Sequence, residues 1–451
     1  MRIIPKRSKM KSTIFKSWGI KDIIVMFIIL VIVLLICMSN LPGRFVVAIV
    51  IAIMSIMLFM PTGPSTLFYT DALQFLKFSF GKKKFTKEKD IDMLMPFKDI
   101  NERGVIVYDN YFAAVLEVGQ KEFGIEDEYQ QNIDIDTLAQ ALKYVEDGQT
   151  VDLVKIDRPV KFDDQVSAVW EKMKSAGDED EERKAVKQLV YYSRLQQLDD
   201  INNVEKIYCP FYYIVIYDEE PRSLEQSINS IAASLEQISL STKRLDATET
   251  AVFLKYSFTR NFDEREADGL KREELMKWIK PKEITFGTNK YKIDDVTAFC
   301  YCLADYPNAV GNAWGAKLFD IDNTKVVMQI RPVDQFKAVK RIDAAVNELA
   351  SKEERKASEM IEKDAHIASM GTLLENLQNE NECLYDVTTT VTRFCYDGDD
   401  AVQTARRKLR QDLSAQGFTA SNLFCRQIDG FLAANISRSA KPKIFERGIN
   451  S

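Results

Sequence analysis

Histidine is nearly missing from this sequence, which contains only His366 among 451 residues. His366 lies in a helical pattern without a second imidazole, which argues against a serine–histidine relay or a metal centre built around it. Seven cysteines are scattered with no Cys-x-x-Cys pair, and an odd number is typical of reduced, buried thiols. Cys300 and Cys302 would share one face of a strand, but two thiols without partners do not make a zinc site.

Motifs for nucleotide, hydrolytic and metal chemistry are missing as well. The sequence has no Gly-x-x-x-x-Gly-Lys-Ser/Thr loop, no Gly-x-Ser-x-Gly, no His-Glu-x-x-His and no dinucleotide-binding fingerprint. Residues 287–290 (Gly-Thr-Asn-Lys) lack the second glycine of a phosphate loop, so we expect a tight turn there. The pairs Asp320/Asp322 and Asp399/Asp400 lie where turns and helix caps use carboxylates. We therefore expect no catalytic residue, no cofactor site and no metal site.

Charge is distributed unevenly along the chain. The net charge is −6, but residues 1–90 carry 14 lysines and arginines against 4 acidic residues, a net of +10, which leaves −16 on residues 91–451. An acidic body lacks the basic footprint of sequence-independent DNA binding, so direct nucleic-acid binding is not expected. The cationic segment suits an anionic membrane surface. The lysines expected at that surface are Lys16, Lys21, Lys82, Lys83 and Lys84.

Two long apolar runs lie within the cationic segment. The first begins at Ile23 and ends at Met38, the second begins at Phe45 and ends at Met60, and neither contains a charged residue. With their flanks they approach the length of about 20 residues that a spanning helix needs. A Pro-Gly loop between them predicts a hairpin. Lysines on both outer flanks predict, by the positive-inside rule, a multi-pass plasma-membrane protein with both termini and the main body in the cytoplasm.

The predicted spans cover about residues 20–39 and 44–61. Two other kinds of segment also contain apolar runs: a signal peptide and a helical hairpin buried in a soluble core. A signal peptide would have a single apolar core and a small-residue cleavage site. A helical hairpin buried in a soluble core would have a polar face. Two charge-free runs favour the transmembrane hairpin over both.

The body that follows alternates strand and helix patterns without a regular strand–helix–strand repeat. Residues 104–108 and 112–118 predict strands around an Asp-Asn turn, and residues 211–217 predict a buried aromatic strand. Ser223 and Gln226 form a capping-box pattern ahead of an amphipathic helix. The fold class predicted for the body is α+β with mixed or antiparallel sheets. Further strands are expected at residues 151–156, 284–286, 296–303, 312–319 and 325–330, and further helices at 135–145 and 248–256.

The last part of the chain begins with an unusually long helical pattern. Residues 334–381 contain no proline and one glycine, Gly371, which predicts one very long helix or two helices joined near that glycine. Residues 383–396 change to a period of two and predict a strand. The aspartates at 399–400 are expected to cap a helix that stops at Gly417. The expected domains are the tail, hairpin and linker at 1–90, an α+β domain at 91–332, and the long helix with a strand–helix unit at 333–451.

Several segments in a particular order carry a resemblance to a known family. They are the strand pair within 104–118, the sequence Leu-Val-Lys-Ile-Asp-Arg-Pro at 153–159, the aromatic strand before Asp218, and Tyr306-Pro307 with Trp314 ahead of the long helix. This order resembles the N-terminal region of the TrbE/CagE-type (VirB-type) transfer ATPase of conjugative type IV secretion systems. The apolar pair is similar to the PrgI/TcpE type of two-helix membrane protein.

The resemblance implies a membrane-anchored structural component of a conjugative DNA-transfer apparatus. The partners that it implies are the membrane, other copies of the chain, a motor domain in cis or in trans, and other channel subunits. The family hydrolyses ATP on a phosphate loop, so ATP is expected only in a motor domain outside this chain, and the chain itself is not expected to be an enzyme. Two alternatives stay open: a fragment of an active motor whose phosphate-loop domain lies downstream or on a separate chain, and a membrane-tethered scaffold or signalling protein unrelated to conjugation.

Overall fold

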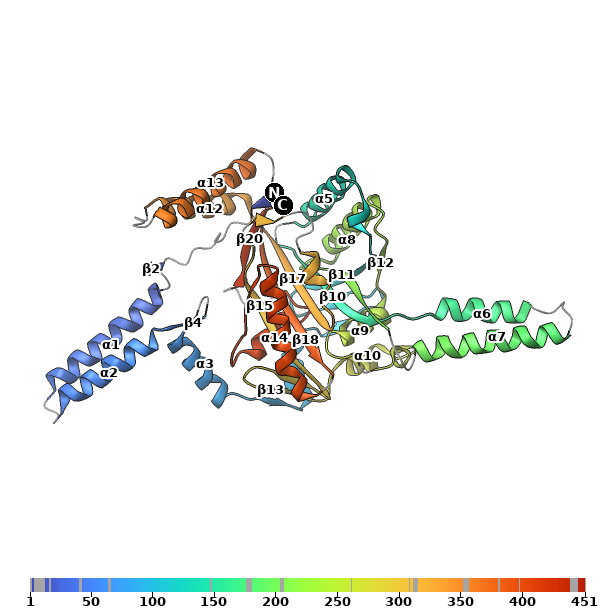
Figure 1. The fold of residues 1–451 in the computed structure, drawn as a ribbon, viewed down its shortest axis with the longest axis horizontal. Helices are drawn as coiled ribbons and strands as arrows, with labels where there is room; N and C mark the ends of the chain where they lie inside the picture. The colour runs from blue at the N-terminus through green and yellow to red at the C-terminus, as the bar shows by residue number, and fades with distance from the viewer. Residues whose placement is uncertain are drawn as a thin grey trace.

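The computed structural model shows a central body from which pairs of helices extend (Figure 1). On one side lie α1 (Ile20–Met38) and α2 (Arg44–Leu58), and on the other α6 (Asp163–Ser175) and α7 (Glu181–Asp200). The described residues are 2–3, 13–15, 18–39, 43–63, 66–146, 148–175, 181–202, 207–260, 262–307, 309–310, 315–351, 357–379, 382–396, 398–438 and 445–450.

The body is built on one antiparallel sheet, which has 14 strands among the described residues. Strands from each of the ranges 1–90, 91–332 and 333–451 belong to it. The main order is β6 (Lys84–Phe85), β13 (Ile284–Phe286), β14 (Tyr291–Ile293), β15 (Val296–Asp305), β18 (Leu384–Cys395), β17 (Thr324–Val333), β10 (Thr150–Pro159), β11 (Tyr208–Asp218), β9 (Phe112–Val118), β8 (Ile106–Val107) and β7 (Asp99–Ile100).

Short strands complete this sheet and form three small pairs elsewhere. β12 (Thr242–Arg244) lies beside β9, β19 (Thr419–Ser421) beside β15, and β20 (Arg447–Asn450) beside β18. The separate pairs are β1 (Arg2–Ile3) with β16 (Ala309–Val310), β2 (Thr13–Phe15) with β3 (Trp18–Gly19), and β4 (Pro61–Gly63) with β5 (Thr66–Leu67).

The long central strands bury apolar side chains on both faces of the sheet. On β10, Val154 and Ile156 belong to the core on one face, whereas Val151 and Leu153 belong to the core on the other face. Successive side chains of a strand point to opposite faces, so one strand can contribute to two cores. This explains the near-continuous apolar sequence of the aromatic strand, β11, which is paired with β10 from Tyr208 to Tyr217.

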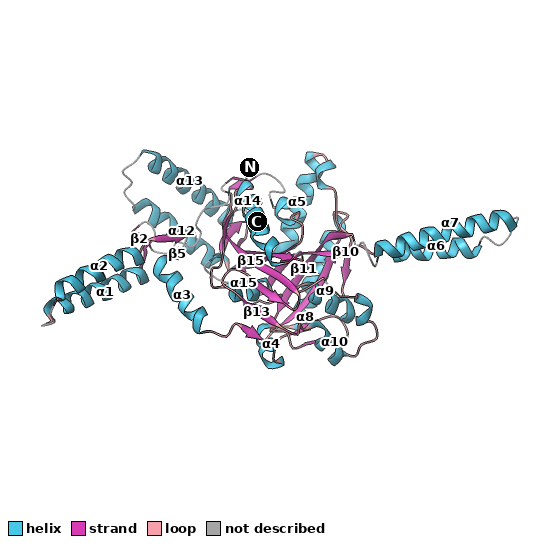
Figure 2. Cartoon of the chain, turned by 60° about the horizontal axis from the view of Figure 1, so that its bottom comes forward, coloured by secondary structure: helices cyan, strands magenta, loops and turns pink. Residues whose placement is uncertain are grey.

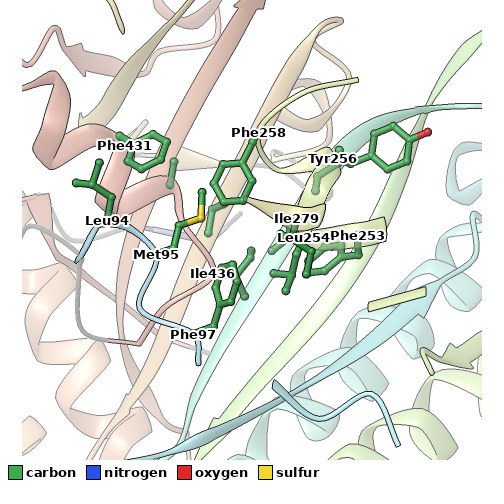
Figure 3. Close-up of a cluster of buried hydrophobic side chains, with 14 of the residues drawn as sticks. Leu94, Met95, Phe97, Phe253, Leu254, Tyr256, Phe258, Ile279, Phe431 and Ile436 are labelled. Atoms are coloured by element: carbon green, nitrogen blue, oxygen red, sulfur yellow. The ribbon is translucent and has the colours of Figure 1, made fainter. Parts of the chain in front are cut away.

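Four short helices cover the first face. They are α4 (Glu88–Leu94), α9 (Ala247–Tyr256), α10 (Arg272–Ile279) and α15 (Gln427–Ala434). Figure 3 shows side chains from all four, including Leu94, Phe253, Ile279 and Phe431, gathered over the strands. Each large apolar side chain buried completely in this way contributes about 1.5–3 kcal/mol. α9 begins with a capping box, in which Asp246 accepts from the backbone of Glu249.

Two longer helices divide the second face between them. α8 (Pro221–Gln237) packs over β9, β11 and β10 through Leu224, Ile228, Ile231 and Leu235. α14 (Asp399–Ala415) packs over β15 and β18 through Val402, Leu409 and Leu413. The remaining helices are α3 (Phe68–Phe80), α5 (Glu128–Lys143), α11 (Ala316–Phe319), α12 (Gln335–Ser351), α13 (Ala357–Asn379), η1 (Phe123–Ile125) and η3 (Glu264–Ala267).

The α+β class of the body is confirmed, but the single long helix is wrong. The region forms α12 and α13, which pack against each other, and their break falls between Ser351 and Ala357. Gly371 lies inside α13 rather than at a joint. Folding back lets Ala338 and Ile342 of α12 meet Met370 of α13 in a shared core. Burial of that apolar stripe stabilises the packed pair of helices.

The two apolar runs are helical, but the prediction of a transmembrane hairpin is wrong. Among the described residues, no helix is both long enough and apolar enough to cross a membrane. α2 has 15 residues, about 22 Å of helix, against a hydrocarbon core of about 30 Å. α1 has 19 residues, but Lys21 and Asp22 occupy its first turn.

The flanking residues that were expected to lengthen these helices form short strands instead. Trp18–Gly19 is β3, which pairs with β2, and Pro61–Gly63 is β4, which pairs with β5. The predicted multi-pass location in the plasma membrane depended on the two spans, so it is corrected together with them. α1 and α2 pack against each other outside the sheet (Figure 1).

Three local predictions also require correction. Ser223 lies inside α8, which begins with Pro221 after Glu220, because the fixed φ of proline suits the first helical position. The residue before α14 is Gly398, so the 399–400 aspartates lie inside the helix rather than at its N-cap. Residues 316–319 form the helical turn α11 and not a strand, while residues 311–314 lie outside the described residues.

Candidate interaction surfaces

The residues that were expected to bound the membrane spans lie on the α1/α2 pair or, for Met60, just after it. Met38 is 80% exposed, Phe45 60% and Met60 56%, and Ile23 is half-buried. The two helices bury little of each other, and Ala48 is the only buried one among the α2 side chains that the structure describes. The pair therefore presents a large apolar surface.

Three of the lysines that were expected at a membrane surface contact other side chains of the protein. Lys83 and Lys84 lie at the edge strand β6, where Lys84 pairs with Thr285 of β13. Lys16 lies outside the described residues, as does the side chain of Lys21. The side-chain contacts are Lys82 with Asp90, Lys83 Nζ with the ring of Phe78 at 4.8 Å, and Lys84 Nζ with Glu283 Oε1 at 2.9 Å.

The family-like residues Tyr306 and Pro307 follow β15 in the chain. Pro307 lies against Gly417, just after the end of α14. Tyr306 is buried, and its hydroxyl donates to Thr389 Oγ1 on β18 at 2.7 Å. Burial raises the pKa of Tyr306 well above its usual range. A Cβ on Gly417, where φ is +83°, would lie 3.2 Å from Pro307 Cγ. Trp314 lies outside the described residues. These residues thus fix where α14 ends against the sheet.

A largely buried cation lies on β10, close to where the chain leaves the sheet towards α6. Arg158, near the end of β10, has Tyr213 Oη at 2.6 Å, Glu117 Oε2 at 3.3 Å and Glu264 Oε1 at 3.5 Å. Burial alone would lower the pKa of this guanidinium, but Tyr213 and Glu264 outweigh burial, and the pKa is raised. The chain runs from β10 through α6 and α7 to β11, so we call α6 and α7 together the arm.

A second cation, Arg260, holds the other strand at the base of the arm. Its guanidinium carbon lies 4.1 Å from the ring centre of Tyr208, the first residue of β11, and 3.7 Å from that of Tyr396. Arg260 also donates to Asn323 Oδ1 at 2.6 Å. A cavity of only about 10 Å³ lies beside it, with room for about one water molecule. The cluster is therefore packed as a clamp and not as a ligand pocket.

Lys155 is a third cation of the body; it is completely buried and lies on the opposite face of β10 from Arg158. Its ammonium group binds Asp157 Oδ1 at 2.6 Å and donates to the carbonyl oxygens of Ile321 at 2.8 Å and Thr324 at 3.2 Å. Burial lowers the pKa of Lys155, while Asp157 opposes that shift. These contacts anchor the loop before β17.

The loop before β17 forms one wall of an open polar depression of about 450 Å³, and α14 forms another. Asp320 and Asp322, which the sequence pairs as possible metal ligands, both lie here. No group of three or more metal-ligating side chains occurs among the described residues, so two carboxylates stand without further ligands. The lining residues are Lys317, Asp320, Ile321, Asp322, Arg393, Lys408, Asp412, Ala415 and Gln416.

The outer face of α14 is cationic. Arg407, Lys408 and Arg410 are exposed, and within the described part of the chain their side chains have no ion pair or hydrogen bond. The opposite face of α14 supplies the apolar contacts to the sheet. In a chain with a net charge of −6, three unpaired cations on one helix face form a distinct surface, the α14 cationic face.

The arm differs from this surface because it exposes large apolar side chains. Only Val169 of α6 and Leu195 of α7 are buried among the arm residues whose side chains the structure describes. Both views show the arm projecting away from the body (Figures 1 and 2). Leu189 is 74% exposed, and the other large exposed apolar side chains are Trp170, Val186, Val190 and Tyr192.

Comparisons with known proteins do not assign the chain to a family. No family model matches it, and no curated protein matches it either. The buried cations and the α14 cationic face were not found by sequence reasoning. The run Arg-Arg-Lys-Leu-Arg at residues 406–410 carries the relevant signal, because helical spacing places three of its cations on the side opposite Leu409.

Proposed function

We propose that this chain is a structural and assembly component of a conjugative type IV secretion apparatus, with a role like that of the N-terminal part of its transfer ATPase. It positions partner proteins and performs no bond chemistry of its own. The partners are other copies of the chain, a motor domain in cis or in trans, and neighbouring channel subunits.

One observation carries this proposal: the segments that bear the resemblance are assembled around a single sheet. The strand pair within 104–118 contributes β8 and β9, and residues 153–159 lie in β10. The aromatic strand β11 lies between β9 and β10. Tyr306 follows β15 in the same sheet and contacts β18. These segments thus supply strands of the same sheet, and the proposal relies on this shared placement.

The surfaces favour assembly over catalysis. Residues 287–290 form the turn between β13 and β14, where Gly287 N donates to Lys290 O at 2.8 Å, so this segment has the tight turn of a hairpin. The open depression has cations and carboxylates in equal number. Long helix pairs with exposed apolar residues, such as the arm, are typical of docking elements.

Gene deletion tests the proposal in the strain that encodes the chain. We expect plasmid transfer to fall to background on deletion and to return when the intact chain is supplied in trans. Undiminished transfer from the deletion strain would rule out the proposed function and favour an unrelated scaffold.

An arm-deleted variant tests the docking role. Val160 N donates to Ile207 O at 2.8 Å and Pro159 pairs with Tyr208, so residues 162–205 can be replaced by Gly-Asn-Gly without disturbing the sheet. We expect this variant to keep the circular dichroism spectrum of a folded body but to lose transfer. Full transfer with a shortened chain would show that the arm has no docking role.

Calorimetry with ATP tests whether the chain has nucleotide chemistry of its own. The chain lacks a phosphate loop, so we expect neither nucleotide binding nor hydrolysis by the purified protein. Micromolar affinity for ATP would contradict the proposal. A phosphate loop in the coding sequence downstream of Ser451 would instead favour the motor-fragment alternative.

A further inference from the structure

The helix α3, which connects α2 to the edge of the sheet at β6, exposes apolar side chains on the side away from the body (Figure 1). Phe78 packs against the core on the first face of the sheet. Leu76 and Phe80 are each two residues from Phe78, which is about 200° around a helix, so both lie on the opposite side. None of the 13 residues of α3, all of which the structure describes, is buried. The large apolar side chains of α3 that are between 47% and 89% exposed are Phe68, Leu73, Phe75, Leu76 and Phe80.

These five side chains form one broad surface, which we call the α3 apolar face. Leu73, Leu76 and Phe80 follow one another at steps of three and four, and Phe68 and Phe75 are seven residues apart. Such spacings keep side chains on one side of a helix. An apolar surface that projects from a protein into water is typical of a surface that a partner covers.

Lysines accompany the α3 apolar face. Residues 77–89 contain six lysines and one acidic residue, a net charge of +5 in a chain whose total is −6. Lys77 lies within α3 at the border of the apolar face, and Lys87 and Lys89 lie at the beginning of α4. All three are exposed, and among the described residues their side chains have no ion pair or hydrogen bond. Three cations are therefore available to an anionic partner.

We propose that α3 binds the surface of a membrane that contains anionic lipids. The helix lies parallel to that surface, with its apolar face among the outer parts of the acyl chains and the lysines among the phosphate headgroups. Helices with phenylalanine and leucine on one face and lysines beside it bind lipid surfaces in this way. With 13 residues α3 is about 20 Å long, shorter than the hydrocarbon core of about 30 Å, so the contact is peripheral and needs no spanning helix.

The chemistry of this surface favours lipid over a protein partner. The five side chains of the α3 apolar face carry no hydrogen-bonding group, whereas protein interfaces contain about one hydrogen bond per 100–200 Å². α2, which contacts α3, also exposes large apolar side chains, Met57 among them. A lipid surface is extended and can cover neighbouring helices together. The inference goes beyond the proposed function, which assigns protein partners alone.

Cosedimentation of the purified full chain with lipid vesicles provides the test. Vesicles of phosphatidylcholine alone are compared with vesicles that also contain phosphatidylglycerol, at low salt and at 0.5 M NaCl. The face variant is Leu76→Ser with Phe80→Ser, and the lysine variant combines Lys77→Gln, Lys87→Gln and Lys89→Gln.

Each variant has a control that changes exposed residues of the same kind elsewhere. The control for the face variant is Leu189→Ser with Tyr192→Ser on the arm, where both side chains are exposed. The control for the lysine variant combines Lys143→Gln, Lys337→Gln and Lys340→Gln, three exposed cations that also have no ion pair among the described residues.

We expect wild type and both controls to bind anionic vesicles more tightly than phosphatidylcholine vesicles, and 0.5 M salt to reduce that difference. The lysine variant should bind anionic vesicles roughly tenfold or more weakly and lose the preference for them. The face variant should bind both kinds of vesicle roughly tenfold or more weakly, because two apolar side chains no longer enter the acyl region. Circular dichroism verifies that each variant is folded.

Three outcomes would overturn the inference: a wild type that binds neither kind of vesicle, a face variant that binds as tightly as wild type, or a lysine variant that keeps the preference for anionic lipid. A wild type that ignores vesicles but self-associates, with that association lost in the face variant, would assign the α3 apolar face to a second copy instead. Vesicle binding is independent of the transfer assay on the deletion strain, so the inference and the proposed function can fail separately.

Discussion

Replacing Arg158 with alanine should lower the free energy of unfolding, because it removes a largely buried cation at the base of the arm. The size of the loss follows from the contacts of this side chain. The guanidinium side chain is only 17% exposed and lies between Glu117 and Glu264. Removal of one partner from a buried ion pair costs about 3–5 kcal/mol, because the remaining charge stays buried. Glu117 is partly hydrated at 27% exposure, and Glu264 keeps Lys161 at 2.9 Å, which places the electrostatic loss near 3 kcal/mol, the low end of that range.

Two aromatic contacts add to this loss. The Arg158 guanidinium carbon lies 4.9 Å from the ring centre of Phe211 and 5.2 Å from that of Tyr256. A cation over an aromatic face contributes about 0.5–1 kcal/mol at such partly exposed sites. The expected total is about 4 kcal/mol, a large fraction of the stability of a typical domain.

Equilibrium urea denaturation followed by circular dichroism measures the loss. The matched control is Arg265→Ala, which removes the same residue type from an ion pair with Asp263 at 2.8 Å, but one in which the arginine side chain is 69% exposed. Solvent screens that pair, so the control should unfold at a urea concentration close to that of the wild type. If Arg158→Ala lowered the midpoint no more than the control does, burial would not be the source of the stability.

Two further predictions concern the junction of β15 and α14. Gly417→Ala should destabilise the protein by about 1–2 kcal/mol, because φ is +83° and the new Cβ meets Pro307. Gly371→Ala, inside α13 with open space around it, should stabilise the protein by about 0.5–1 kcal/mol. Urea midpoints that move in the same direction for both variants would contradict this. Burial raises the pKa of Tyr306 above 10.0, so the unfolded chain releases that proton first as the pH rises. The stabilisation is complete below about pH 10 and is lost as the pH rises towards the folded-state pKa, so Tyr306→Phe should flatten the fall in unfolding free energy above about pH 10, by at most about 1.4 kcal/mol per pH unit. Parallel curves for the two proteins would show that Tyr306 ionises alike in both states.

Local sequence patterns predicted many elements of the body correctly. The period of two in residues 383–396 corresponds to β18, and the run at 211–217 lies within β11. Apolar residues at steps of three and four after Ser223 form the buried side of α8. These elements depend on which side chains face a core, and that information repeats along a few residues of sequence.

Other predictions failed where the deciding contacts are distant in sequence. The break between α12 and α13 has no glycine or proline to mark it, and it follows from the packing of Ile342 against Met370. The apolar runs were expected to be longer helices, but strand pairs end them at β3 and β4. α15 and β20 were not predicted at all.

The sequence by itself determined the missing catalytic motifs, the charge division and the positions of most strands and helices, because these depend on residue types and short periods. Only the tertiary structure decided that strands from Lys84 to Asn450 join one sheet, and that Arg158 and Arg260 clamp the base of the arm. Glu264 reaches Arg158 from a position 106 residues away in the sequence. The energy of such a contact comes from removing both groups from water together, and that depends on how the whole chain folds.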